Sequence, residues 1–310
     1  MIQVLPKPDG GTDTPAVAKD WFKGRGARSA VRSLEQGAHF YQLDESVRVA
    51  VNTALALGEP LLVTGEPGTG KTQLAYYLAQ RLDCGPVLRF QVKSTSQASD
   101  VLYQFDAVRY FHAGRAGEAG QKIEPTAFRE KGVLWQAIES ERPRVVLIDE
   151  IDKAPRDFPN DLLQALDEYQ WSVLETGEHQ RLPPEEWDRR PVVIITSNDE
   201  HKLPAAFLRR CLHCHIPFSR ELLQRAVEAR AEELNRPDPA FIQLALDRFE
   251  KVRELAARKR PSTAEALVWL RALRGFGVKM KELESSLAEL PHLEALLKDE
   301  EDREALKRRG

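Results

Sequence analysis

A stretch near residue 65 combines glycines with a single lysine in a pattern that predicts phosphate binding. Residues 65–72, "GEPGTGKT", fit the pattern G-x-x-x-x-G-K-[ST], with an apolar run before them and helical spacing after them. The glycines allow successive backbone N–H groups to converge on one anion, and the start of the following helix adds partial positive charge. The simpler alternative is a glycine-rich turn between strand and helix that binds nothing.

Two side chains of this loop have specific expected roles. Lys71 is predicted to reach the β- and γ-phosphates of a nucleotide, and the Thr72 hydroxyl is predicted to ligate Mg²⁺. The expected nucleotide-binding positions are Gly65, Glu66, Pro67, Gly68, Thr69, Gly70, Lys71, Thr72 and Gln73. Because such a loop contacts phosphates only, it does not distinguish ATP from GTP.

Two further motifs place polar residues after apolar runs. In "VVLIDEIDKA", Asp149 and Glu150 end a predicted strand, where ligands of open α/β sheets gather. We expect Asp149 to hold the Mg²⁺ shell, and Glu150 to orient and polarise the water that attacks the phosphate. In "PVVIITSNDE", Asn198 is expected to position the same water. Taken alone, a carboxylate pair can be a solvated strand edge, and an asparagine after a strand is usually a turn residue.

The elements that must position these residues follow an alternating pattern. Residues 39–218 alternate short β-rich apolar runs with helical patterns, which predicts an α/β fold with a parallel sheet covered on both faces. The predicted strands are 61–64, 87–92, 144–148, 192–196 and 212–217. Residues 144–149 and 191–198 have the unbroken Val and Ile character of strands buried on both faces.

The rest of the chain divides into three expected parts. Residues 1–38 are predicted to be a basic, flexible tail that carries Trp21 and Phe22. Residues 219–280 are predicted to be a helical domain, with a capping box in "STAE" at 262–265. Residues 281–310 are expected to add one or two surface helices.

Composition limits the class of protein. The 310 residues are 42% hydrophobic and 30% charged, with no apolar stretch near the ~18 residues that a membrane span needs. The start of the chain does not have the pattern of a signal peptide, and three cysteines suggest reduced thiols. We therefore expect a cytoplasmic protein with no membrane partner. The net charge of −3, from 45 basic and 48 acidic residues, argues against a protein built mainly to bind nucleic acid.

The segment "CLHCH" resembles a metal site only in composition. On a strand, Cys211, His213 and His215 would point to one side, and Leu212 and Cys214 to the other. Four ligands could not converge on one ion from such a strand, so we expect these residues to pack rather than bind zinc.

Together the motifs carry a family resemblance. "GEPGTGKT", "VVLIDEIDKA", "IITSND" and "LPAAFLRRCLHCHIPF", followed by a helical region, resemble an AAA+ ATPase, and the entry "YQLDESVRVAVNTALALGEPLLVTGEPGTGKT" is similar to the MoxR group. The resemblance covers about residues 39–275. It implies a five-stranded parallel sheet in a P-loop NTPase core, a C-terminal helical lid, ATP with Mg²⁺, and a hexameric ring that remodels partner proteins. It also implies that 65–72 is the Walker A loop, Asp149 and Glu150 the Walker B pair, and Asn198 sensor 1.

Three other expectations depend on this resemblance. Arg209 and Arg210 lie where such proteins place an arginine that enters a neighbouring subunit's site, with Arg210 preferred over Arg209; a surface arginine pair is the alternative. Residues 93–140 and 171–191 are expected to contain hairpins that face the pore or a partner, although ordinary surface loops would also fit. Ala264 stands where MoxR-like lids carry a second-sensor arginine, so either Arg260 or Lys259 replaces it or the lid senses the nucleotide weakly.

Three functions fit these observations unequally. The first, which the MoxR resemblance implies, is a ring ATPase that remodels or activates a client protein, with a von Willebrand A domain protein as one candidate client. The second is a nucleic-acid motor or a restriction-type translocase with the same engine, which the charge balance disfavours. The third is a catalytically idle scaffold, which the presence of Lys71, Asp149 and Glu150 disfavours.

Overall fold

The computed structural model describes residues 30–116, 124–234 and 238–309. By its internal contacts the chain divides into two compact units. Among the described residues, a sheet unit comprises Leu43–Glu66 and those within Lys71–Ile216, and a helical unit comprises those from Pro217 onward with Pro67–Gly70 and residues 30–42. Most of the expected basic tail, including Trp21 and Phe22, lies outside the described residues, and its last nine residues form helix α2 (Ala30–Ala38).

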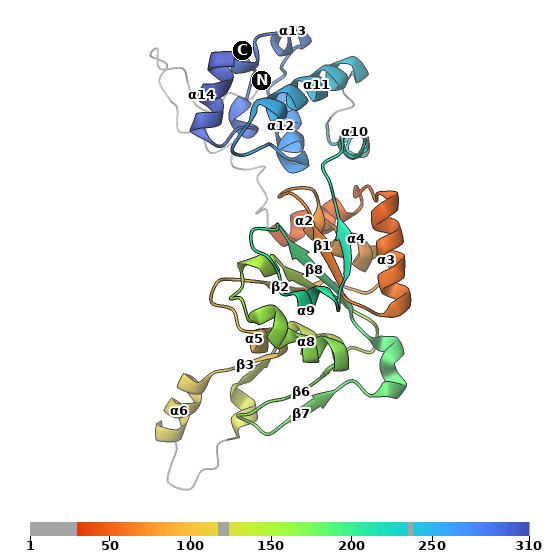
Figure 1. The fold of residues 1–310 in the computed structure, drawn as a ribbon, viewed down its shortest axis with the longest axis vertical. Coiled ribbons are helices and arrows are strands. Elements are labelled where there is room, and N and C mark those ends of the chain that lie inside the picture. The colour runs from red at the N-terminus through yellow and green to blue at the C-terminus, as the bar shows by residue number, and fades with distance from the viewer. Residues whose placement is uncertain (1–29, 117–123, 235–237, 310) are drawn as a thin grey trace, which may run out of the picture. The chain divides into compact units, whose positions relative to one another are not determined.

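The sheet unit contains the five-stranded parallel sheet that the sequence predicts (Figure 1). Its strands are β1 (Leu61–Thr64), β2 (Leu88–Gln91), β5 (Val145–Asp149), β8 (Val192–Ser197) and β9 (Leu212–His215). They are ordered β2-β5-β8-β1-β9, and every neighbouring pair is parallel. Since parallel strands end at the same edge of a sheet, Thr64, Asp149 and Ser197 come to one edge.

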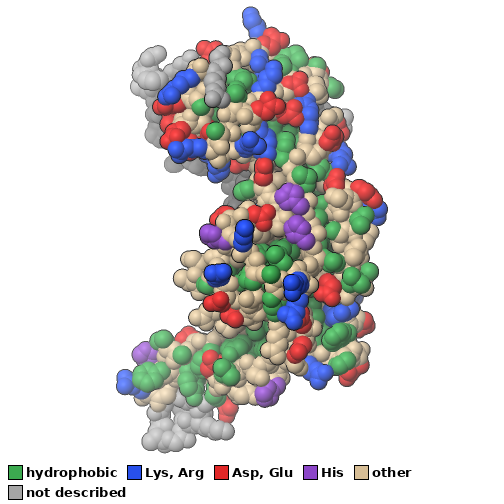
Figure 2. Space-filling view, in the orientation of Figure 1, with side chains coloured by type: hydrophobic (Ala, Val, Ile, Leu, Met, Phe, Trp, Pro, Cys, Tyr) green, Lys and Arg blue, Asp and Glu red, His purple; other side chains and the backbone are tan. Residues whose placement is uncertain are grey.

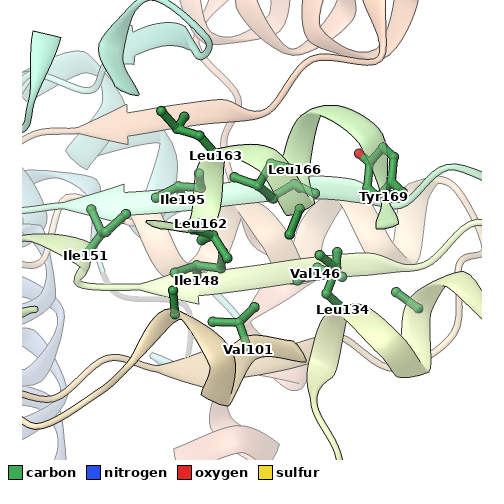
Figure 3. Packing of buried hydrophobic residues seen from close by; sticks show 14 of the residues in the cluster. Val101, Leu134, Val146, Ile148, Ile151, Leu162, Leu163, Leu166, Tyr169 and Ile195 are labelled. Atoms are coloured by element: carbon green, nitrogen blue, oxygen red, sulfur yellow. The ribbon is translucent and has the colours of Figure 1, made fainter. Parts of the chain in front are cut away.

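Helices cover both faces of this sheet, which explains why β5 and β8 are apolar without interruption. On one face, Val146, Ile148 and Ile195 pack with residues of the surrounding helices, among them Leu134 and Leu162 (Figure 3). These helices are α5 (Ala98–Leu102), α7 (Val133–Ile138) and α8 (Phe158–Glu168). The alternate strand residues face the other side. There α3 (Glu45–Leu57) and α4 (Lys71–Arg81) contact the strands.

Both insertions contain the expected hairpins. The first holds β3 (Tyr103–Phe105) and β4 (Arg129–Lys131), an antiparallel pair, with α6 (Ala107–Ala116) between them. The second holds β6 (Gln170–Ser172) and β7 (His179–Arg181), joined through a turn in which Gly177 has φ of +73°.

The two hairpins form one body, which the sequence did not indicate. Tyr103, Trp135 and Val173 make a small buried cluster, and the Trp135 and Trp171 rings meet edge to face with centroids 6.1 Å apart. Arg129 Nη2 lies 2.7 Å from Glu178 Oε1, which adds an ion pair between the two insertions. The insertions are therefore a shared platform rather than two separate surface loops.

The helical unit has its own core. Its helices are α10 (Arg220–Glu228), α11 (Pro239–Leu255), α12 (Thr263–Gly275), α13 (Met280–Leu283) and α14 (Glu300–Arg309). The capping box is confirmed, since Glu265 accepts the Ser262 backbone N–H at 3.0 Å. Trp269 and Phe249 are fully buried at its centre.

Residues 281–310, expected to add one or two surface helices, include helix α14, whose polar residues are largely exposed, while several of their leucines are buried. Leu290, Leu296, Leu297 and Leu306 are all buried in the same cluster as Trp269. The spacing of these leucines reflects their burial against α11 and α12. Each Å² of apolar surface removed from water there stabilises the fold by about 25 cal/mol. The C-terminal segment thus belongs to the core of the helical unit.

Strand β9 shows the expected alternation. His213 Nε2 and His215 Nδ1 lie 2.9 and 3.0 Å from the Thr64 hydroxyl, on one face of the sheet, while Cys214 is buried on the other. Within the described ranges no group of three or more His, Cys, Asp or Glu side chains is arranged to hold a metal ion. The same ranges contain no helix with both the length and the apolar character that a membrane crossing requires.

Candidate nucleotide-binding site

The phosphate-binding loop is closed by Lys71, the first residue of α4. Its ammonium donates hydrogen bonds to the carbonyl oxygens of Gly65 (2.7 Å) and Glu66 (2.9 Å), and the side chain is buried. Gly68 and Gly70 have φ of +78° and +97°, a backbone conformation that is strained for residues with a Cβ atom. The loop therefore curls around its own lysine, as expected of an anion-binding loop.

Burial makes Lys71 an unusual cation. Removal from water lowers the pKa of Lys71, while the nearby carboxylates of Asp152, Asp149, Asp199 and Glu150 act in the opposite direction. Hydrogen bonds to two backbone carbonyls only weakly replace the hydration that the Lys71 ammonium loses on burial. Phosphate oxygens bound in the loop would satisfy this charge better.

Thr72 and Asp149 meet as the sequence predicts. Thr72 Oγ1 donates to Asp149 Oδ1 at 2.9 Å, and Thr196 Oγ1 donates to the same oxygen at 2.7 Å. Since the Thr72 hydrogen points at the carboxylate, the lone pairs of its oxygen are directed elsewhere. A hydroxyl with outward lone pairs beside a buried carboxylate fits a Mg²⁺ ion, which prefers oxygen ligands and keeps several waters.

Glu150 adopts a strained backbone at the end of β5. Its φ and ψ are +62° and 53°, in the left-handed region, and such a residue costs about 1–3 kcal/mol. Its backbone N–H donates to Thr196 Oγ1 at 2.8 Å. Its Oε2 accepts from Gln91 Nε2 at 2.7 Å and from Lys153 Nζ at 2.6 Å, and this hydrogen bond raises the pKa of Lys153. Two hydrogen-bond donors, from Gln91 and Lys153, thus hold the Glu150 carboxylate at the edge of the sheet.

Arg89 completes the site and was missed at the sequence level. Its Nε and Nη2 lie 3.1 and 2.6 Å from Asp149 Oδ2, so it neutralises the carboxylate whose other oxygen faces Thr72. The sequence did contain a signal, because Arg89 and Gln91 alternate in a predicted strand and so share one face. The sequence did not indicate which strand of the sheet would lie beside Arg89 and Gln91.

Asn198 follows β8 at the same edge, and its position depends on Asp152. Asp152 Oδ2 accepts the backbone N–H groups of Asn198 and Glu200, both at 3.0 Å. Asp152 is 2% exposed, and its Oδ1 has no hydrogen-bond partner in the described part of the chain. Sequence reasoning did not single out Asp152, although "DEIDKA" contains it.

Arg209 and Arg210 stand apart from this cluster. They follow α9 (Ala205–Leu208), and Arg210 Nε pairs with Asp167 Oδ2 of α8 at 2.8 Å. The two side chains of this pair are 50% and 35% exposed. Within one chain these arginines make no hydrogen bond to the residues that surround Lys71 and Asp149.

The second-sensor region lies in the helical unit. Ala264 is in the first turn of α12, as its place in the sequence suggests. The candidate replacements, Lys259 and Arg260, belong to a loop that Asp302 of α14 holds, because its carboxylate accepts the backbone N–H groups of Ala257, Arg258 and Lys259 at 2.9–3.1 Å.

The comparisons with known proteins agree with this geometry. Residues 60–211 match the family model described as AAA domain (dynein-related subfamily). The chain is thus similar to AAA domains over 152 of its 310 residues. The matched range runs from the residue before β1 to the residue before β9, so it contains residues 65–72, Asp149, Glu150 and Asn198.

Two proteins show what this chain is similar to. It is 28% identical over 232 residues to the probable chaperone protein ClpB 1 of Chlorobaculum tepidum, which is 68% of this chain and 48% of that protein. The chain therefore spans about half the length of this relative. The structure of NtrX from Brucella abortus in complex with ADP shares the fold, with a TM-score of 0.52, 15% identity, and coverage of 90% of this chain and 63% of that one.

Proposed function

We propose that this chain binds ATP with Mg²⁺ and hydrolyses it as a MoxR-like AAA+ ATPase that works in an oligomeric ring to remodel or activate a client protein. The observation that carries the hydrolysis is the meeting of Lys71, Thr72, Asp149 and Glu150 at one sheet edge. These side chains can bind a triphosphate, hold a metal and activate a water, which is what phosphoryl transfer requires.

Each residue has a chemical task in this proposal. Lys71 exchanges its two carbonyl partners for β- and γ-phosphate oxygens, while Thr72 and Asp149 hold the metal ion. Bound Mg²⁺ would neutralise the charge of the phosphates. Glu150 accepts a proton from the water as its oxygen bonds to the γ-phosphorus, and ADP leaves in line. Asn198 positions that water.

A ring is proposed because Arg210, in the described part of the sheet unit, pairs with Asp167 and not with the residues around Lys71. The exposed Arg210–Asp167 pair is worth about 0–1 kcal/mol. An arginine supplied from a neighbour can be worth about 10³–10⁵ in kcat, or roughly 4–7 kcal/mol. Arg210 can therefore give up Asp167 for a neighbouring subunit's nucleotide, and Arg209 is the second candidate. We propose a hexamer.

A protein client in the cytoplasm is favoured over nucleic acid. The relative ClpB 1 is named a probable chaperone. On the visible face of the sheet unit, basic and acidic side chains are interspersed, without the single-sign stripe that a phosphate backbone attracts (Figure 2). The platform of the two hairpins is the proposed client contact, and a von Willebrand A domain is one candidate client. The alternative remains a nucleic-acid motor or a restriction-type NTPase.

The first experiment compares the purified chain with three variants. Mg²⁺-dependent ATP hydrolysis is expected for the natural chain. Lys71→Ala should lose nucleotide binding, Glu150→Gln should bind ATP in an assembled ring without turnover, and Arg210→Ala should bind ATP with little change in affinity and lose turnover. Undiminished hydrolysis by the Glu150 variant would refute the role given to it. GTP in place of ATP tests the choice of base.

The second experiment identifies the partner. The Glu150→Gln chain, stalled with ATP, is used as bait, and mass spectrometry identifies what it retains relative to the Lys71→Ala chain. Protein capture that depends on bound ATP supports the client proposal. An ATPase rate that duplex or single-stranded DNA raises in a salt-sensitive way would favour the nucleic-acid motor instead.

A further inference from the structure

A cavity opens at the edge of the sheet opposite the phosphate-binding loop. It has a volume of about 640 Å³ and lies where β1 and β8 begin and where α3 and α4 end. Its apolar wall includes Val51, Ala54, Leu61, Leu78 and Ile194. Two apolar side chains that line it are exposed, Leu82 by 42% and Trp187 of the short helix η3 (Pro184–Arg189) by 38%. A concave apolar site of this volume is suited to binding.

The two arginines that line the cavity are already engaged. Arg190 donates from Nε to the Trp187 carbonyl oxygen at 2.9 Å, and its guanidinium lies over the Trp187 ring, 5.2 Å from the centroid. Arg142 Nη1 lies 4.0 Å from Asp83 Oδ2. An anionic ligand would have to compete with these contacts.

The remaining charge around the cavity is negative. Glu59 and Asp188 line it, and neither forms an ion pair with any described residue. Helices α3 and α4 both end here, and the C-terminal end of a helix carries partial negative charge that favours a cation. The cavity therefore suits an apolar side chain that has lysine or arginine next to it in sequence.

The chain contains a segment with this chemistry. Residues 19–25, "KDWFKGR", place two adjacent aromatic residues, Trp21 and Phe22, between basic residues. This segment lies outside the described residues. Aromatic side chains bury about 150–250 Å² each, and tryptophan is enriched among the residues that dominate the energy of an interface.

The position of Arg210 indicates which copy of the chain supplies the segment. Leu212, the first residue of β9, donates its backbone N–H to the carbonyl oxygen of Pro60 at 2.9 Å, directly before β1. Arg210, two positions before Leu212, therefore lies at the same edge of the sheet as the cavity. A copy that received Arg210 in its nucleotide site would lie against this edge.

We propose that residues 19–25 of that neighbouring copy dock in this cavity, with Trp21 and Phe22 against its apolar wall and the basic residues beside Glu59 and Asp188. The choice of a neighbouring copy rests on the proposed function, because it assumes that Arg210 acts in a neighbour's site. Such a contact uses one surface on each copy and a different one on the next, so it repeats around a ring.

The binding test uses the full-length chain with Trp21→Ala and Phe22→Ala, which lacks the proposed occupant. A fluorescent peptide of residues 15–27 is expected to bind it, whereas the peptide with both aromatic residues replaced by Ala is not. Adding Leu82→Arg, which puts a cation at the apolar rim, should weaken peptide binding about 10-fold. Val268→Arg, at a side chain 53% exposed on α12, should leave it unchanged. No binding, or equal loss in the two arginine variants, would overturn the proposal.

A crosslinking test identifies the copy that supplies the segment. Trp21→Cys and Leu82→Cys are introduced into separate chains of different mass, which are mixed and treated with a mild oxidant. A disulfide-linked pair of unequal chains is expected, and Val268→Cys in place of Leu82→Cys should give none. If a chain carrying both Trp21→Cys and Leu82→Cys forms this disulfide only within itself, the neighbouring copy is the wrong occupant and the proposal is overturned.

The two proposals can fail separately. If the natural chain hydrolyses ATP but the peptide does not bind and no mixed pair forms, the docking is overturned and the proposed function stands. If the peptide binds and the mixed pair forms in a chain that hydrolyses no ATP, the docking is supported and the proposed function fails.

Discussion

The Thr196 hydroxyl lies 2.7 Å from Asp149 Oδ1 and donates its proton to that carboxylate. Thr196 Oγ1 also accepts the backbone N–H of Glu150 at 2.8 Å, so one side chain of β8 contacts both Asp149, the last residue of β5, and Glu150, which follows it. This arrangement exists because β5 and β8 are adjacent and in register, with Ile148 opposite Ile195. Asp149 is thereby aimed at Thr72, and the turn of Glu150 is stabilised.

Thr196→Val, which removes this hydroxyl, should lower both the stability of the fold and the ATPase rate. Valine has nearly the same shape, but it leaves the Glu150 N–H unpaired and removes a donor from a buried carboxylate. We expect a loss of about 1–3 kcal/mol in the free energy of unfolding. We also expect a fall in ATPase kcat. Urea titration and a steady-state assay measure the two effects, and Thr196→Ser, which keeps the hydroxyl, is the matched control.

Asp152→Asn should disturb the segment that carries Asn198. The amide can still accept through its oxygen, but it loses the charge that binds the two backbone N–H groups of Asn198 and Glu200. Turnover should fall more than nucleotide affinity, because Asn198 acts on the water and not on the phosphates. Asp157→Asn, on an exposed residue nearby, should behave as the natural chain does. Equal effects of the two substitutions would contradict this role of Asp152.

Nucleotide affinity should fall at alkaline pH, because Lys71 loses its charge there. Burial lowers the pKa of Lys71 in the free protein below the ordinary 10.5, and bound phosphates favour the charged form. At pH values between the pKa of Lys71 in the free protein and its higher pKa in the nucleotide complex, Lys71 takes up a proton when the nucleotide binds. Nucleotide affinity should therefore fall as pH rises through this range. For the ligand-free chain the sign is opposite, because the unfolded state binds more protons in the range up to 10.5 and stability rises with pH. Titrations with a fluorescent nucleotide from about pH 7 to about pH 10 measure the first effect.

Asp167→Ala should have little effect on either folding or hydrolysis. The pair with Arg210 is half exposed, and such pairs contribute about 0–1 kcal/mol. Since Arg210 must leave Asp167 to reach a neighbour's site, removing the aspartate should leave the ATPase rate within about two-fold of the natural chain. A rate as low as that of Arg210→Ala would show that Asp167, rather than a neighbouring nucleotide, is the functional partner of Arg210.

The cysteines should be slow to react in the folded chain. Burial raises the pKa of Cys211 to about 12 and also raises the pKa values of Cys84 and Cys214. Because the thiolate is the reactive form, alkylation near pH 8 should be slow until urea unfolds the protein. Mass spectrometry of iodoacetamide-treated samples counts the modified thiols. Rapid labelling of Cys211 before unfolding would contradict its burial.

Local patterns were sufficient for much of the site. The glycine-rich loop between β1 and α4 was predictable because glycine spacing, the lysine and the flanking strand and helix all lie within about fifteen residues of one another. Asp149 and Glu150 were predictable because an apolar strand ends at them. The alternation of β9 was similarly predictable, since His213 and His215 both reach the Thr64 hydroxyl from one face.

Other features required the fold. The sequence did not indicate what covers the leucines of residues 281–310, because leucine spacing does not reveal the surface against which a helix packs. The two insertions were predicted as independent hairpins, but the Arg129–Glu178 ion pair and the Trp135–Trp171 contact join them.

By itself, the sequence determined the chemistry available to this protein: a loop for phosphates, a hydroxyl and a carboxylate for a metal, and a glutamate for water. Only the tertiary structure decided which residues restrain that chemistry. Arg89 and Asp149 are 60 positions apart, and Asp152 and Asn198 are 46 positions apart. Contacts over such distances depend on the order β2-β5-β8 in the sheet, which no local pattern of residue types encodes.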